Sequence, residues 1–133
     1  TRGMFVTMIV GVFDKNKREL LLSNAGHEPP LIFSKDGNFK TIDEAGPPLG
    51  IAPNFKFTEQ IISFKESSMY IFTDGITEMK NNNGEMLGQE GFQDYIKKYQ
   101  STPNNKRLQK MIEDLISSGR IQKDDLTIVT VDG

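Results

Sequence analysis

The period of the apolar residues changes once along this chain, and that change limits the folds open to it. Up to Thr73 the apolar residues alternate or run together in short stretches, which is typical of β-strands. Beyond Asp74-Gly75 they recur about every 3.6 residues, the period of an amphipathic helix. A chain of 133 residues is long enough for one core and short for two. We therefore predict a single α+β domain over residues 1–133, with a mainly antiparallel sheet and a helical pair on one face.

The first half of the chain predicts paired strands. Residues 4–13 are apolar at both parities, which is typical of a strand buried on both faces inside a layered structure. A polar turn at 14–17 and a return strand at 19–23 would complete a hairpin. Further strands are predicted at 31–33, 57–64, 69–73 and 126–131, with a hairpin turn at 35–38 and a proline-shaped loop at 46–53.

The second half predicts two amphipathic helices. Their apolar stripes follow the spacing i, i+3, i+4, i+7. The stripes are Phe92, Tyr95, Ile96 and Tyr99, then Leu108, Met111, Ile112 and Leu115. Pro103 separates the two helices, and Asn104 or Asn105 is expected to cap the second. Gly119 suits the left-handed residue just past its end.

Composition excludes several classes of protein. With 36% hydrophobic and 26% charged residues and a net charge of -2, the chain has neither a disordered composition nor a basic face for nucleic acid. No apolar run is long enough to span a bilayer, and the first residues lack the layout of a signal peptide, so we expect a cytoplasmic protein with no membrane contact from this segment. The absence of cysteine excludes disulfides and thiolate metal sites. Oxygen ligands remain, and these favour Mg²⁺ or Mn²⁺.

Acidic residues lie next to two strand ends. Asp74 follows the apolar run 69–73, and Asp124-Asp125 precedes the apolar run 126–129. Carboxylates at the ends of rigid strands suit a divalent-metal site. The same residues also fit an ordinary Asp-Gly turn and a solvated loop, and spacing does not separate these interpretations. His27 is interpreted as a structural loop residue, and Arg120 and Lys123 as surface charges.

Six segments together indicate a family. They are Met4-Phe5-Val6-Thr7, Asn24-Ala25-Gly26-His27, Gly46-Pro47-Pro48-Leu49-Gly50, Phe72-Thr73-Asp74-Gly75-Ile76-Thr77-Glu78, Gly84-Glu85-Met86-Leu87-Gly88 and Asp124-Asp125-Leu126-Thr127. In this order, over essentially the whole chain, they resemble the sporulation stage II E and sigma-B-regulator branch of the metal-dependent (type 2C) protein phosphatases.

The resemblance implies an antiparallel β-sandwich flanked by helices, with two Mn²⁺ or Mg²⁺ ions at one end in the complete domain. By the family's motifs, Asp74 and Asp124 would bind metal and serve catalysis, and Asp125 would support the metal site from beside them. The implied reaction is hydrolysis of a phosphate ester by a metal-activated water, without a phospho-enzyme. The implied substrate is phosphoserine or phosphothreonine on a regulatory protein of the anti-sigma-factor-antagonist type.

The chain also departs from the family pattern. Family members carry a Gly-Asp metal-binding motif before the Met-Phe-Val-Thr strand, and this sequence has none, so the N-terminal portion of the domain is expected to be missing. His27 stands where some relatives have an aspartate for a further metal. We therefore expect this chain alone to bind metal weakly and to be inactive. An exposed sheet would then allow homodimerisation.

Two other functions are compatible with the sequence. One is a degenerate phosphatase that acts as a non-catalytic protein-interaction module in bacterial signalling. The other is an α+β domain whose acidic residues only form turns. A Gly-Asp metal motif upstream of Thr1 would favour the phosphatase, and its loss would favour the module. Asp74→Asn or Asp124→Asn in a full-length parent would test the third function, because an unchanged rate would remove both residues from the metal site.

Overall fold

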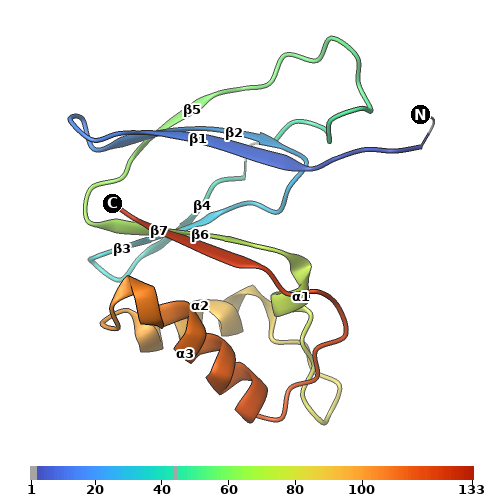
Figure 1. Cartoon of the computed structure of the whole chain (residues 1–133), viewed down its shortest axis with the longest axis vertical. Coiled ribbons are helices and arrows are strands. Elements are labelled where there is room, and N and C mark those ends of the chain that lie inside the picture. Colours follow the sequence, from blue (N-terminus) through green and yellow to red (C-terminus); the bar gives the residue numbers. More distant parts are fainter. Residues whose placement is uncertain (1–2, 44) are drawn as a thin grey trace.

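The computed structural model describes residues 3–43 and 45–133, and Thr1, Arg2 and Glu44 lie outside that description. The described residues form three layers, namely a three-stranded sheet, a four-stranded sheet and a layer of helices (Figure 1). The strands are β1 (Met8–Asp14), β2 (Glu19–Ala25), β3 (Leu31–Ser34), β4 (Phe39–Thr41), β5 (Gln60–Ser63), β6 (Ser67–Phe72) and β7 (Ile128–Asp132). The helices are α1 (Asp74–Thr77), α2 (Gly88–Tyr99) and α3 (Asn104–Ser117).

Both sheets are antiparallel. The first has the strand order β1-β2-β5, and the second has the order β4-β3-β6-β7. The two sheets stack face to face, and the helices cover the free face of the second sheet (Figure 1). The antiparallel β-sandwich flanked by helices, which the family resemblance implied, is therefore confirmed. The apolar pattern alone predicted one mainly antiparallel sheet with two helices on one face, and it did not predict the second, outer sheet.

Two hydrophobic cores separate the three layers. The core between the sheets contains Leu20 and Leu22 of β2 together with Ile32 and Met69 of the second sheet. Next to Met69, the side chain of Tyr70 belongs to the other core, between the second sheet and the helices. Successive side chains of a strand point to opposite faces, so β3 and β6 supply both cores at once. This explains why the first three residues of β3 and the last four of β6 are consecutively apolar.

The predicted helices are present, with one difference at a cap. The helical stripes bury Phe92 and Ile96 of α2 and Met111 and Leu115 of α3 against the second sheet. Gly119 has φ 82, as predicted for the residue past the end of α3. The cap prediction was wrong. Pro103 occupies the N-cap position, where its carbonyl accepts hydrogen bonds from the N–H groups of Lys106 and Arg107, and Asn104 is already helical. None of the helices in residues 3–43 and 45–133 has the length and apolar character needed to cross a membrane.

The first predicted strand is shorter and more exposed than expected. β1 begins at Met8, and before it Val6 exchanges two backbone hydrogen bonds with Leu49. Val12 of β1 and Ile61 of β5 lie in one row across the outer face of the sheet, joined by Leu21 of β2, and are 62% and 70% exposed. The prediction of a strand buried on both faces was wrong, because the outer face of this sheet is not covered by any other described element. β5 likewise begins at Gln60, later than predicted.

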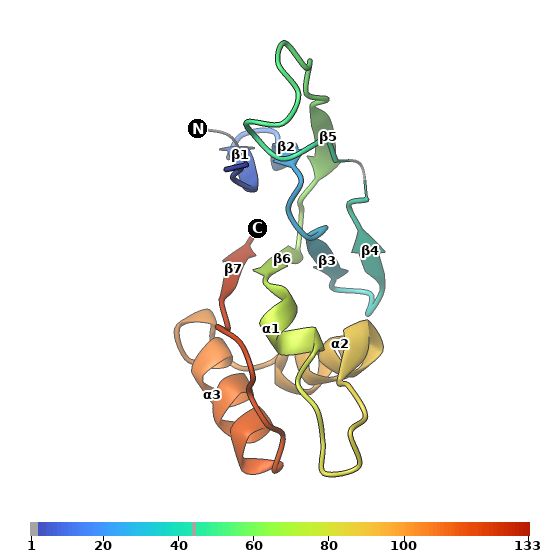
Figure 2. The same cartoon turned by 90° about the vertical axis from the view of Figure 1, so that its right-hand side faces the viewer.

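One free edge of each sheet lies on the same side of the molecule. β1 and β7 are edge strands, each with a single neighbour in its sheet. Figures 1 and 2 place both on one side of the stacked sheets. Val10 of β1 and Val129 of β7 are 49% and 47% exposed, so apolar side chains accompany both unpaired edges.

Candidate metal centre

Asp74 lies where the central strand β6 ends. Thr73 is still extended, with φ -97 and ψ 162, and the chain then turns into the single helical turn of α1. The Glu78 N–H donates to the Asp74 carbonyl at 2.9 Å. Asp74-Gly75 is therefore part of a helical turn rather than the ordinary Asp-Gly turn that the sequence also allowed, and the fully buried Ile76 side chain packs this turn into the helix-side core. The carboxylate of Asp74 stays exposed at the strand end, as the sequence indicated.

The segment that carries Asp124 and Asp125 runs directly alongside. Thr73 and Thr127 are joined by two hydrogen bonds: the Thr73 N–H donates to the Thr127 carbonyl at 3.1 Å, and the Thr127 N–H donates to Thr73 Oγ1 at 3.2 Å. Gly75 packs so closely here that a Cβ at this position would overlap the Asp125 carbonyl oxygen. Glycine is therefore required at position 75 by close backbone approach. The fold thus brings the two predicted acidic segments together at one end of β6.

The side chain of Asp124 is held by its own loop. Asp124 Oδ1 accepts a hydrogen bond from the Asp125 N–H at 2.8 Å, and Gln122 Nε2 donates to the Asp124 carbonyl at 3.0 Å. Both aspartates are exposed. Within residues 3–43 and 45–133, three or more His, Asp or Glu side chains do not gather at metal-binding distances. The three predicted residues are neighbours, therefore, but they do not form a complete ligand cage among the described residues.

Glu28 is a neighbour of Asp74 that sequence reasoning did not find. The hydrogen-bonding contact with the Asp74 carboxylate, followed by partial burial, raises the pKa of Glu28 above its usual range. The turn that carries Glu28 is fixed by the buried Asn24 side chain, whose Nδ2 donates to the His27 carbonyl and whose Oδ1 accepts from the His27 N–H. Two carboxylates therefore face each other beside the end of β6, an arrangement that a cation would favour.

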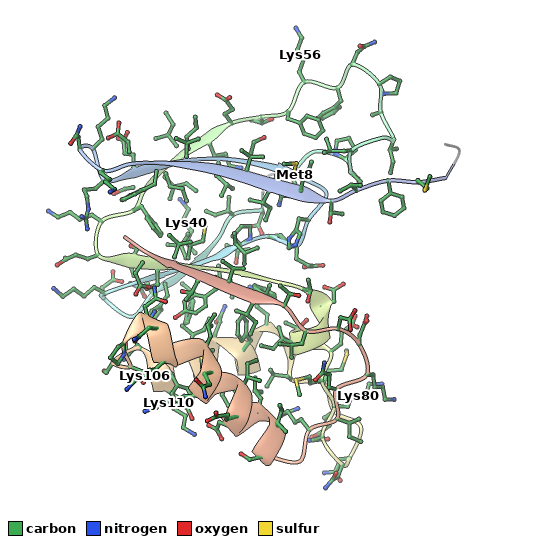
Figure 3. All side chains as sticks on the ribbon, in the orientation of Figure 1. Met8, Lys40, Lys56, Lys80, Lys106 and Lys110 are labelled. Carbon is green, nitrogen blue, oxygen red and sulfur yellow. The ribbon has the colours of Figure 1, made fainter. Side chains whose placement is uncertain are left out.

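The remaining candidates divide into structural and lining residues. His27 Nδ1 lies 3.0 Å from the Glu28 carbonyl, in agreement with its interpretation as a loop residue. The Arg120 guanidinium donates to the carbonyls of Met79 and Glu85 at 3.3 and 3.4 Å. Arg120 therefore stabilises the segment after α1, rather than acting only as the surface charge that the sequence indicated. Lys123 lines a hollow beside Asp124. Figure 3 shows Lys80 on the segment after α1, near the loop that leads to β7.

Two hollows adjoin the end of β6. One, of about 420 Å³, is lined by residues that include Glu28 and Phe72. The other, of about 310 Å³, is lined by residues that include Gly75 and Asp124. The candidate metal centre therefore lies at the rim of open, solvent-accessible space rather than in a closed core.

This architecture is that of known type 2C phosphatase domains. The SiaA-PP2C domain of Pseudomonas aeruginosa superposes with a TM-score of 0.74 at 18% identity, over 90% of this chain and 48% of that one. The phosphatase domain of the cell fate determinant SpoIIE from Bacillus subtilis, presoaked with Mn, gives 0.68 at 18% identity, over 95% and 55%. At these identities the likeness concerns the fold.

The chain belongs to the family described as Stage II sporulation protein E (SpoIIE), whose model matches residues 1–132. It is 31% identical to Protein IcfG of Synechocystis sp. over 97% of its length, and 26% identical to Phosphoserine phosphatase RsbU of Bacillus subtilis, also over 97%. The chain spans 21% and 39% of the lengths of these two relatives. The family predicted from the six motifs is thereby confirmed.

Proposed function

We propose that this chain is the C-terminal part of a metal-dependent protein serine/threonine phosphatase, and that Asp74 and Asp124 contribute to its divalent-cation site. The observation that carries the proposal is the contact of Gly75 with Asp125, together with the Thr73–Thr127 pairing. These contacts align two acidic segments that are distant in sequence. Membership of the SpoIIE family and the similarity to Phosphoserine phosphatase RsbU support the same function.

The ligand atoms of the candidate residues are of the type that Mn²⁺ and Mg²⁺ prefer. Exposed aspartates offer only oxygen ligands, which hard dications prefer. The close approach of Glu28 to Asp74 leaves negative charge that a dication would offset. Structural neighbours include a SpoIIE domain presoaked with Mn and RsbX in complex with magnesium. When bound, such ions would supply Lewis-acid chemistry and activate water for attack on the phosphate ester.

The protein's own residues would position this chemistry. Asp74 and Asp124 would be ligands of the ion, and Asp125 would support the loop of Asp124 through its backbone N–H, which donates to the Asp124 carboxylate. The anchoring of Asp74 on β6 and α1 would keep the ligand spacing fixed. Because the described residues do not complete a cage, the remaining ligands would come from elsewhere in the complete phosphatase.

The proposed substrate is phosphoserine or phosphothreonine on a regulatory protein of the anti-sigma-factor-antagonist type, in cytoplasmic signalling. The name of the relative RsbU specifies phosphoserine. A structural neighbour from Mycobacterium tuberculosis combines RsbU and RsbW domains in one structure, which supports a regulatory-protein partner.

The experiment is substitution of the two aspartates in the complete phosphatase that contains this chain. Asp74→Asn and Asp124→Asn should each lower the Mn²⁺-dependent rate of phosphoserine hydrolysis on the order of a hundredfold, because each removes a charged ligand. Asp94→Asn, an exposed aspartate on α2, is the matched control and should retain the rate. An unchanged rate in the first two variants would remove both residues from the metal site.

The second candidate function is a non-catalytic interaction module, favoured by the incomplete ligand set within the described residues. Calorimetric titration of the complete protein with Mn²⁺ separates the two. The phosphatase requires binding that Asp74→Asn weakens. The module predicts a titration that this substitution does not alter.

A further inference from the structure

The two hollows at the candidate centre are parts of one groove. Glu78, which follows α1, and Met86 line both of them, so the hollows adjoin at these two side chains. Glu28, which contacts Asp74, lines the larger hollow, and Asp124 lines the smaller one. The groove is therefore lined directly by Asp124, and it reaches the neighbourhood of Asp74 through Glu28.

The charge along this groove is unequal. The larger hollow is lined by three acidic residues, Glu28, Asp43 and Glu78, and by no Lys or Arg among the described residues. The smaller hollow is lined by Lys80 and Lys123 together with Glu78 and Asp124. One end of the groove thus favours positive charge, and the other end offers two ammonium groups to a negative one.

The floor of the groove is apolar where the two ends meet. Met86 is 58% exposed there, although it is a large hydrophobic side chain. Phe72 also lines the larger hollow. An apolar floor below acidic groups suits a Lys or Arg side chain, whose aliphatic stem packs on carbon while its charged head meets carboxylates.

The groove walls are tied together. The Leu87 N–H donates to the Met79 carbonyl at 2.8 Å, and the Ile121 N–H donates to the Lys80 carbonyl at 2.9 Å. The Arg120 guanidinium joins the carbonyls of Met79 and Glu85. These bonds connect the Met86 wall to the segment before Lys123, so the groove is formed before any ligand enters.

We propose that this groove binds the substrate polypeptide next to its phosphorylated residue, with a Lys or Arg of that polypeptide seated between Asp43 and Glu78 and its stem on Met86. The proposal rests on the phosphatase function proposed above. The phosphate would lie at the other end, beside Asp124, where Lys80 and Lys123 also line the smaller hollow and would attract its negative charge. The groove would thereby select phosphopeptides with a basic residue on one flank.

Binding is the suitable measurement, because it does not depend on turnover. Two fluorescent peptides share a central non-hydrolysable phosphonate analogue of phosphoserine, and carry either Arg or Glu on the flanks. Anisotropy titrations use the complete phosphatase with Mn²⁺. The Arg peptide is expected to bind about fivefold more tightly than the Glu peptide, as expected for partly exposed charge pairs. Asp43→Lys should abolish this preference, and Asp94→Lys, which makes the same charge change on α2, should retain it.

Each outcome decides the proposal. Equal binding of the two peptides, preference for the Glu peptide, or no binding of either would overturn it. A preference that persists in Asp43→Lys would also overturn it, since the selectivity would then arise elsewhere. Failure of the phosphatase proposal is seen separately, as absent phosphoserine hydrolysis by the wild-type protein, and peptide binding remains measurable in that case.

Discussion

The two sheets of this molecule are built from similar sequences and have different surroundings. β1 and β6 both carry apolar residues at consecutive positions. In the second sheet Tyr70 is 1% exposed because the helices cover its face, and the neighbouring Met69 is 4% exposed because the outer sheet covers the opposite face. In the outer sheet Val12 is 62% exposed. An apolar run therefore shows that a strand could be buried on both faces. Whether both faces are in fact buried depends on which other layers of the fold cover them.

The difference also explains where the candidate centre lies. Asp74 follows the strand whose last residue, Phe72, packs edge-on against Phe92 with ring centroids 4.9 Å apart. The doubly covered sheet thus gives the carboxylate a rigid support. The outer sheet contributes the buried Asn24, which fixes the turn before Glu28, while its other face remains open.

The largest expected effect tests the two layers directly. Phe92→Ala should lower the free energy of unfolding by about 3–5 kcal/mol, because it empties a fully buried site below β6. Val12→Ala, the matched change in the outer sheet, should cost less than about 1 kcal/mol. Urea unfolding followed by circular dichroism measures both. Equal losses would show that the outer sheet is as well packed as the inner one.

A second comparison concerns ion pairs. Arg107, which is 6% exposed, donates from Nη1 and Nη2 to both carboxylate oxygens of Asp132 at 2.9 and 3.2 Å. Arg107→Ala should destabilise the fold by about 2–3 kcal/mol, because it leaves the Asp132 carboxylate without its partner. The exposed pair Lys35–Glu66 is the control, and Lys35→Ala should cost less than about 1 kcal/mol.

The same pair predicts a pH dependence. Burial opposes ionisation of Asp132, but the hydrogen bonds from Arg107 and Ser68 outweigh it and lower its pKa. The pair therefore stabilises fully above the ordinary aspartate pKa of about 3.9, and this contribution is lost as the pH falls through the lowered value. Acid unfolding of Arg107→Ala should show a correspondingly weaker dependence on pH in that window. An identical dependence would contradict the assignment.

The smallest expected effect concerns self-association. Val10 and Val12 on β1 and Val129 on β7 present apolar side chains beside two unpaired edges, so a homodimer through this exposed side is predicted. Val12→Lys should weaken association about tenfold, and Ile116→Lys, an exposed apolar site on α3, should leave it unchanged. Light scattering over a concentration series measures this. A monomer at every concentration would contradict the prediction.

Local sequence patterns predicted a helix or strand well where its structure depends mainly on nearby residues. The stripe containing Phe92 and Ile96 specified α2, and the turn residues at 35–38 specified the β3–β4 hairpin. The errors arose where the outcome depended on distant residues. Asp74 begins a helical turn because the Ile76 side chain packs into a core formed by distant residues. Pro103, rather than an asparagine, occupies the N-cap position because α3 already begins at Asn104.

The site shows the same limit. Asp74, Asp124 and Asp125 were predicted from their places at strand ends and from family motifs, and the fold aligns their segments. Whether they share a cation stays a prediction. Glu28 and Glu78 have no local signal that separates them from surface acids, since their proximity to Asp74 depends on how β2, β6 and α1 meet.

The backbone contacts around α1 have a consequence for how this chain tolerates changes in length. Residues 82–84 form an exposed tip supported by the Asn81 side chain, so an added residue there would only lengthen a projecting hairpin. The stretch from Ile121 to Asp125 is held at both ends: the Ile121 N–H donates to the Lys80 carbonyl, and the Asp125 carbonyl packs against Gly75. One residue inserted between these fastenings would force the intervening chain to bulge and carry Asp124 away from Asp74. Insertions should therefore be tolerated in the loop at residues 82–84 and disfavoured in the loop between Ile121 and Asp125.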